Sequence, residues 1–171
     1  MSFEPVLVED REPEVIDPAA WRAAMGAFAS GVVIVSSLDG DRPVGTTVSA
    51  FSSVSLSPPL LLVCLDHKSR TREAILQTGA FGINVLSQGQ SGLAKLFAGM
   101  AATDRFNDVE IAPGPLGMPL IGGALAHIEC RLHAVHAAGD HDILVGRGLE
   151  LGTRPGRPLI YSQGRFHDAA E

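Results

Sequence analysis

Several cations stand at what the sequence predicts to be the start of a helix. Ser69 has the residue type of a helix N-cap, and residues 71–77 follow as the helix. Lys68, Arg70 and Arg72 surround its first turn, where the helix dipole makes each cation unfavourable by roughly 0.3–1 kcal/mol. An anion bound to the free N–H groups would offset that cost. Two interpretations stay open: a phosphate site, which we favour, and a solvated basic surface.

An earlier segment of the chain has the residue types of a strand along which a flat ring could lie. Thr46, Thr47 and Ser49 offer hydroxyl groups, and the small Ala50 leaves space beside them. Backbone N–H and C=O groups of such a strand could pair with the edge of a heteroaromatic ring. An ordinary half-exposed strand would contain the same residues, so both interpretations remain.

The histidines raise the question of a metal site. His133 and His136 would point to opposite faces of one strand and could not share an ion without a bulge, so we expect no metal. His141 differs because it lies in a turn, Gly139–Asp142, that leads into a strand. Turns at the mouth of a barrel often carry function, and for His141 a functional and a structural role are equally open.

Composition and missing motifs exclude several classes of protein. The net charge of -6 argues against nucleic-acid binding. Cys64 and Cys130 are too few and too far apart for a disulfide framework. The acidic N-terminus lacks the basic region of a signal peptide, and the longest aliphatic run, residues 60–65, is too short to cross a membrane. The sequence has no GxGxxG, P-loop or GxSxG motif. We therefore expect a cytoplasmic protein that binds neither nucleic acid nor membrane.

Short elements must position these groups. Asp17 and Pro18 predict a helix start, and Trp21, Met25 and Phe28 follow near helical spacing and are expected to pack in the core. The other expected elements are strands at 31–38, 43–55, 60–65, 81–86, 124–136, 142–151 and 158–161, a short helix at 92–97 and an ordered loop at 112–123.

The strand expected at 124–136 alternates. Cys130 and its like-facing neighbours should be buried, and Glu129 should lie on the opposite, polar face. Many short strands joined by turns indicate an antiparallel barrel, because a doubly wound fold needs regular alternation of strand and helix. We expect one domain over residues 18–171, preceded by a flexible acidic arm at 1–17.

The order of these motifs resembles a known family, the short-chain flavin reductases of two-component monooxygenases. The resemblance rests on GTTVSAF at 45–51, SPP at 57–59, VCL at 63–65 and SRT at 69–71. It continues through FGINVL at 81–86, RF at 105–106, GDH at 139–141 and PLIY at 158–161, and so covers about residues 19–167.

The resemblance implies a mainly β fold, a split antiparallel β-barrel of the FMN-binding type with a few short peripheral helices. It also implies a homodimer that binds FMN or FAD, oxidises NADH or NADPH, and releases reduced flavin to a separate monooxygenase. No catalytic side chain is certain, because the hydride passes between two cofactors. Two alternatives remain: a non-catalytic flavin-binding or flavin-carrier protein, and an oxidase of the same barrel acting on another substrate.

The resemblance also implies roles for particular residues. His141 matches a position implicated in nicotinamide binding. The residues that match the flavin site, from the ring to the phosphate and a further wall, are Thr46, Thr47, Val48, Ser49, Ala50, Cys64, Leu65, Ser69, Arg70, Thr71, Arg105 and Phe106.

Overall fold

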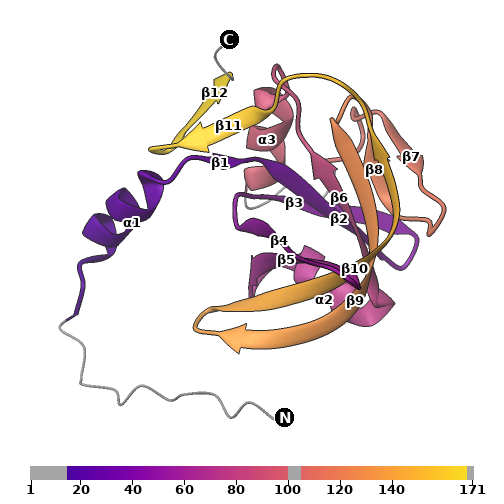
Figure 1. Ribbon diagram of the computed structural model, residues 1–171, viewed down its shortest axis with the longest axis horizontal. Coiled ribbons are helices and arrows are strands. Elements are labelled where there is room, and N and C mark those ends of the chain that lie inside the picture. The colour runs from indigo at the N-terminus through magenta and orange to yellow at the C-terminus, as the bar shows by residue number, and fades with distance from the viewer. Residues whose placement is uncertain (1–14, 100–104, 169–171) are drawn as a thin grey trace.

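A curled antiparallel sheet forms the body of the molecule (Figure 1). The computed structural model describes residues 15–99 and 105–168. Its main sheet has seven strands in the order β3-β2-β6-β9-β10-β5-β4. The two end strands, β3 and β4, do not pair with each other, so the barrel is split, as the family resemblance implied.

Each predicted helix and strand has a counterpart, but four short strands in the described residues were not predicted. The bounds of all the elements follow. They are α1 (Pro18–Gly26), β1 (Ser30–Gly31), β2 (Val33–Asp39), β3 (Arg42–Val48), β4 (Phe51–Leu56), β5 (Pro59–Asp66), α2 (Arg70–Thr78), β6 (Ala80–Val85), α3 (Ser91–Ala98), β7 (Ile111–Pro113), β8 (Pro119–Ile121), β9 (Ala126–Ala138), β10 (His141–Thr153), β11 (Leu159–Ser162) and β12 (Arg165–Asp168). Of the predicted arm at 1–17, residues 1–14 lie outside the described part.

Two apolar clusters lie on the two faces of the sheet. One fills the barrel, with Val63, Phe81 and Leu144 among its fully buried members. The other packs α3 on the opposite face, through Phe97 and Ile34. Successive side chains of a strand point to opposite faces, and residues 33–37 of β2 are all buried, so both faces of this strand are covered.

The segment predicted as one strand at 43–55 forms two strands. The chain bends at Ser49 and Ala50, where the N–H of Phe51 donates to the Ser49 carbonyl at 3.0 Å. β3 then pairs with β2, whereas β4 pairs with β5 at the far end of the sheet. The bend therefore carries the chain across the split of the barrel. Because the residues on both sides of it are strand formers, the sequence pattern did not reveal that the strand is interrupted.

The predicted loop at 112–123 contains a short hairpin, β7–β8, that covers part of β9. Glu129 is buried beneath it, with 1% of its surface exposed. Its Oε1 accepts hydrogen bonds at 3.0 Å from the N–H groups of Leu116 and Met118. The expectation that Glu129 lies on a solvated face was wrong, because period-2 alternation cannot show what covers the polar face.

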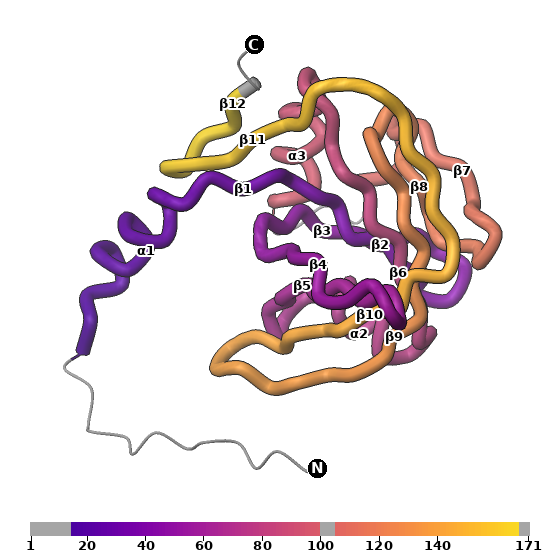
Figure 2. The backbone as a smooth tube through the Cα atoms, in the orientation of Figure 1, coloured from indigo at the N-terminus to yellow at the C-terminus, as the bar shows by residue number. Residues whose placement is uncertain are grey.

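Helix α1 begins as predicted but does not join the core. The Asp17 carboxylate caps it, accepting from the Ala20 N–H at 2.9 Å. Trp21 and Met25 are each 53% exposed and Phe28 is 79% exposed, so the predicted core packing was wrong. The helix projects away from the barrel (Figure 2) and is tied at its end to the β11–β12 turn by the hydrogen bond from Gln163 N–H to the Gly26 carbonyl. In the described part of the chain no helix is long and apolar enough to span a membrane.

Candidate functional site

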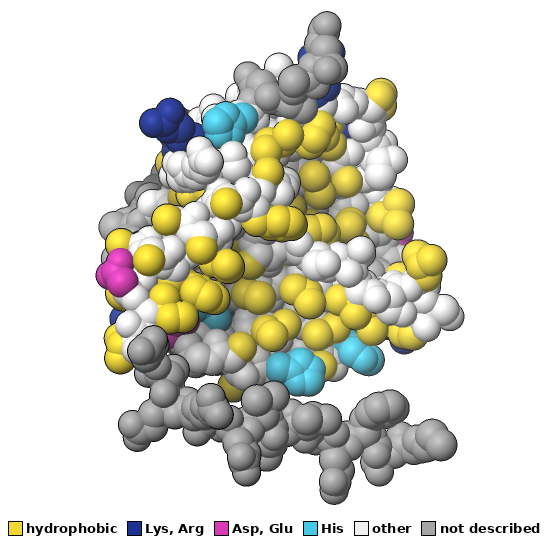
Figure 3. All heavy atoms as spheres, turned by 60° about the vertical axis from the view of Figure 1, so that its left-hand side comes forward, with side chains coloured by type: hydrophobic (Ala, Val, Ile, Leu, Met, Phe, Trp, Pro, Cys, Tyr) yellow, Lys and Arg dark blue, Asp and Glu magenta, His cyan; other side chains and the backbone are white. Residues whose placement is uncertain are grey.

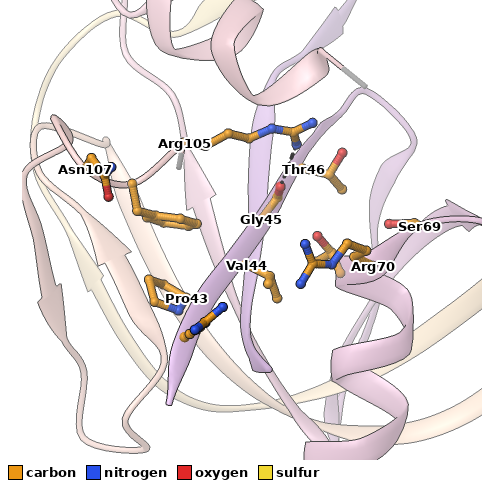
Figure 4. Close-up of a pocket in the computed structure, with 11 residues that line it drawn as sticks. Pro43, Val44, Gly45, Thr46, Ser69, Arg70, Arg105 and Asn107 are labelled. Carbon is orange, nitrogen blue, oxygen red and sulfur yellow. Dashed lines mark hydrogen bonds between the residues drawn. The ribbon is translucent and has the colours of Figure 1, made fainter. Parts of the chain in front are cut away.

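A pocket of about 600 Å³ lies between β3 and the start of α2. Six of the predicted flavin-site residues line it: Thr46, Ser69, Arg70, Thr71, Arg105 and Phe106. Figure 4 shows these groups approaching from β3, α2 and the 105–107 segment. The sequence analysis missed five further lining residues: Arg42, Pro43, Val44, Gly45 and Asn107. The described residues that line the pocket include three arginines and no carboxylate, which suits a ligand that carries phosphate.

The start of α2 is capped as predicted. The Ser69 hydroxyl accepts from the Arg72 N–H, with oxygen and nitrogen 3.4 Å apart, and the first intrahelical backbone bond runs from the Glu73 N–H to the Ser69 carbonyl. The N–H groups of Arg70 and Thr71 precede that bond and belong to the orphan donors of a helix N-terminus. Because both residues line the pocket, this turn can present N–H groups to an anion.

The cations of this turn have separate roles. Arg70 lines the pocket and makes an exposed ion pair with Asp39, with 3.0 Å between Nη2 and Oδ2. Arg72 instead contacts Asp142 through Nε at 2.6 Å and Nη2 at 2.5 Å. Lys68 is not among the lining residues. The expectation that all three cations surround one anion site was therefore wrong. Of the three, only Arg70 lines the pocket, and Arg42 and Arg105 line it from other segments.

Arg105 and Phe106 form one wall of the pocket. Arg105 Nη1 donates to the Gly45 carbonyl at 3.0 Å (Figure 4) and to the Phe97 carbonyl, also at 3.0 Å. Phe106 packs edge-on against Phe97, with ring centroids 4.8 Å apart. Burial lowers the pKa of the Arg105 guanidinium. A Cβ at Gly45 would lie 3.0 Å from the Phe106 ring and 3.1 Å from a backbone carbonyl, so glycine is what allows this wall to close on β3.

The residues predicted to bind the ring are divided between two pockets. Thr46 lines the large pocket, whereas Thr47, Val48 and Ser49 line a smaller one of about 160 Å³. The Thr47 hydroxyl donates to the Ala94 carbonyl at 2.8 Å and so packs β3 on α3. β3 is nevertheless an end strand of the sheet, and one of its edges therefore presents backbone N–H and C=O groups that β2 does not use.

The two predicted residues of β5 differ in what they can offer a ligand. Leu65 is 2% exposed and belongs to the barrel core, which leaves only its backbone for a ligand. Cys64 is half-buried, and its N–H donates to the Ala50 carbonyl at 3.1 Å. Burial raises the pKa of the Cys64 thiol, so this thiol stays protonated at neutral pH.

His141 lies at the start of β10, outside the lining of both pockets on β3. Its Nδ1 is 2.7 Å from the Asp140 carboxylate, which leaves Nε2 facing away from that partner. The imidazole lowers the pKa of the Asp140 carboxyl, through the hydrogen bond and its charge. The structure thus connects His141 to the site through neighbouring residues and does not place it in the pocket.

Comparison with known proteins identifies the family. The family described as "Flavin reductase like domain" matches residues 25–170. An NADH-dependent flavin reductase of Rhodococcus sp is 42% identical over 159 residues, which cover 91% of this chain and 88% of the relative. The reductase subunit HsaB of a flavin-dependent monooxygenase from Rhodococcus jostii is 39% identical, over 90% and 78% of the two chains.

Solved structures agree with the sequence comparison. The NADH:FAD oxidoreductase of Streptomyces globisporus superposes with a TM-score of 0.86 at 34% identity, covering 98% of this chain and all of that one. The sequence match, the split barrel and the pocket all agree with the same family. The chain belongs to the flavin reductase family.

Proposed function

We propose that this protein is an NAD(P)H:flavin oxidoreductase. It transfers a hydride from NADH or NADPH to FMN or FAD and supplies the reduced flavin to a separate monooxygenase. The observation that carries the proposal is the pocket of about 600 Å³, where three arginines converge beside an end strand of the sheet. Relatives named as flavin reductases and as monooxygenase reductase subunits support both parts.

We assign the two ends of the flavin to two elements. The ring lies along residues 46–50, where the outer edge of β3 offers backbone N–H and C=O groups, with the backbone of Cys64 and Leu65 nearby. The phosphate lies at Ser69–Thr71, where N–H groups and Arg70 favour negative charge. Arg105 and Phe106 close the far wall.

These residues bind and orient their ligands and need not act as nucleophiles. Bound flavin supplies the acceptor for the nicotinamide hydride. The protein contributes an approach distance of roughly 3–3.5 Å between the reacting atoms and N–H groups that favour negative charge on the ring edge. His141 is assigned to the nicotinamide side, with Asp140 holding its Nδ1 and leaving Nε2 for the ligand.

The test is a direct assay of turnover. Purified protein is mixed with NADH or NADPH and with FMN or FAD, and oxidation is followed by loss of the reduced-nicotinamide absorbance. We expect rapid loss that needs added flavin, and the four combinations rank the cofactors. A yellow protein that leaves both nicotinamides unoxidised would instead support the flavin-carrier alternative.

We also propose that two copies of the chain form a homodimer. Trp21, Met25 and Phe28 of the α1 region are exposed. Figure 3 shows hydrophobic side chains gathered over a hollowed face on the side toward which α1 projects. An exposed apolar area of this kind on a soluble protein marks an interaction surface, and a second copy would supply a matching helix and hollow.

Light scattering after gel filtration tests the dimer. Wild-type protein should elute with twice the chain mass, and Trp21→Glu should shift it to the monomer. Glu73→Gln, an exposed change on another helix, serves as the control and should stay dimeric. A monomeric wild-type protein at micromolar concentration would contradict the proposal.

We place the protein in the cytoplasm. Both cysteines, Cys64 and Cys130, carry free thiols, as is usual in a reducing compartment. Cell fractionation followed by immunodetection tests this location, and recovery in a membrane or extracellular fraction would contradict it.

A further inference from the structure

Asp142 connects the start of α2 to the turn that carries His141. Its carboxylate is 5% exposed and has three polar contacts. Oδ2 accepts from Arg72 Nε at 2.6 Å and lies 2.5 Å from Arg72 Nη2. Oδ1 lies 3.2 Å from His67 Nε2. Both ends of the carboxylate are therefore occupied by residues that flank or begin α2.

The backbone reinforces the same connection. The His67 N–H donates to the Asp140 carbonyl at 3.1 Å, and Asp142 pairs with Leu65 across the β5–β10 ladder. Neighbouring residues of a strand point to opposite faces, so Asp142 faces α2 while His141 faces the other way. The Asp142 side of the turn at 139–142 is thus fastened to the start of α2, and the His141 imidazole is presented on the other side.

The pocket shares this anchor. Ser69, Arg70 and Thr71, which line the pocket, precede Arg72 in the same helical turn. One turn of α2 therefore holds the proposed phosphate site with three residues and the His141 turn with the fourth. Burial is partial for Arg72, whose side chain is 24% exposed, and nearly complete for Asp142, so the link is a fixed part of the fold.

We propose that Asp142, held by Arg72 and His67, is a positioning residue for hydride transfer. It sets the place of His141, and so of the nicotinamide, relative to the flavin bound at the start of α2. This rests on the proposed function, in particular on the assignment of His141. A misplacement of about 1 Å in a reacting group is enough to cost up to roughly 100-fold in rate.

The test is a double-mutant cycle in steady-state kinetics at saturating flavin. Asp142→Asn should raise the KM for the reduced nicotinamide about tenfold, while the flavin Kd, measured by quenching of flavin fluorescence, stays within about twofold. His141→Ala should raise the same KM. In the His141→Ala background, Asp142→Asn should add no further change, because it acts through the imidazole.

The outcomes separate this proposal from the one on which it rests. If His141→Ala leaves the nicotinamide KM unchanged, the assignment of His141 fails. If His141→Ala raises KM but Asp142→Asn does not, or if its effect persists without His141, the positioning role alone is overturned. Glu73→Gln, which removes an exposed carboxylate from the same helical turn, should leave the nicotinamide KM unchanged.

A second variant keeps the test valid if Asp142→Asn fails to fold. His67 is 43% exposed, so His67→Gln should preserve the fold, and its backbone N–H to Asp140 remains. It should raise the nicotinamide KM by about threefold and lose that effect in the His141→Ala background. A threefold effect that persists there, or no effect, overturns the proposal.

Discussion

Arg70 and Arg72 stand two residues apart in one turn of α2, yet they belong to different parts of the molecule. Arg70 is 59% exposed, lines the pocket and pairs loosely with the exposed Asp39. Arg72 is 24% exposed and is held twice by the nearly buried Asp142. The first can turn toward a ligand at small cost, whereas the second is committed to the fold.

The difference shows that a cation at a helix start has two possible explanations. A bound anion can offset the unfavourable dipole, and so can a carboxylate brought by another strand. Asp142 supplies the second explanation for Arg72, since it comes from β10, about seventy residues later in the chain. Of these two arginines, only Arg70, which lines the pocket, supports a phosphate site.

The largest expected effect separates these two arginines. Arg70→Gln should weaken flavin binding about tenfold, because it removes a charge-assisted contact worth roughly 1.4 kcal/mol. Arg72→Gln, the same change two residues on, should alter the flavin Kd by less than about twofold. Fluorescence titration with FMN and FAD measures both. Equal losses for the two variants would mean that Arg72 also serves the phosphate, contrary to its contacts.

A second prediction concerns unfolding at low pH. There Arg72→Gln should have a larger effect than Arg70→Gln, which is the reverse of their effects on flavin binding. The Arg72 hydrogen bond, with a smaller effect from His67, holds the pKa of the Asp142 carboxyl below its usual value of 3.8. Because the folded-state pKa is below the unfolded one, this carboxylate stabilises the fold above about pH 4 and the stabilisation is lost as pH falls through the folded pKa.

Arg72→Gln should therefore raise the pH at which acid unfolds the protein. Arg70→Gln should leave that pH unchanged, because its pair with Asp39 is exposed to solvent. Circular dichroism during an acid titration from pH 7 to pH 2 measures both midpoints. The comparison between the two arginines fails if their variants unfold at the same pH.

The same contrast explains how much could be predicted from the sequence. Ser69 and Gly79 mark the two ends of α2 through local chemistry, a cap and a left-handed residue, and the structure has both. An antiparallel barrel followed from the short strands and turns, whereas its split form came from the resemblance to the flavin reductases. Local signals of this kind need no knowledge of distant partners.

What could not be predicted depends on such partners. Burial of Glu129 requires the β7–β8 hairpin, the bend at Ser49 requires β4 to pair with β5, and exposure of Trp21 requires that α1 leave the barrel. The place of Arg42 in the pocket was missed because it is 28 residues before Arg70, the first residue of α2, which lines the same pocket. Each depends on tertiary contacts that composition and periodicity do not encode.

The smallest expected effect concerns the partner of Arg70. Asp39→Asn removes the carboxylate that competes with a phosphate for Arg70, and both side chains of that pair are about half exposed or more. Exposed pairs are worth about 0.2–1 kcal/mol, so the flavin Kd should tighten by no more than about fivefold at low salt. Screening should shrink this gain at about 1 M salt, where the Debye length is near 3 Å.

The salt dependence of this small change in flavin Kd tests the contrast between the two arginines. The flavin Kd values of wild type and Asp39→Asn, measured at low and high ionic strength, should converge as salt rises. The reason is that salt screens the exposed Arg70 from Asp39 in the wild-type protein. A Kd that weakens on removal of Asp39 would show that the carboxylate orients Arg70 for the ligand. In that case Arg70 would be held in place by its partner, as Arg72 is, and the distinction between the two arginines would lie only in the ligand each one faces.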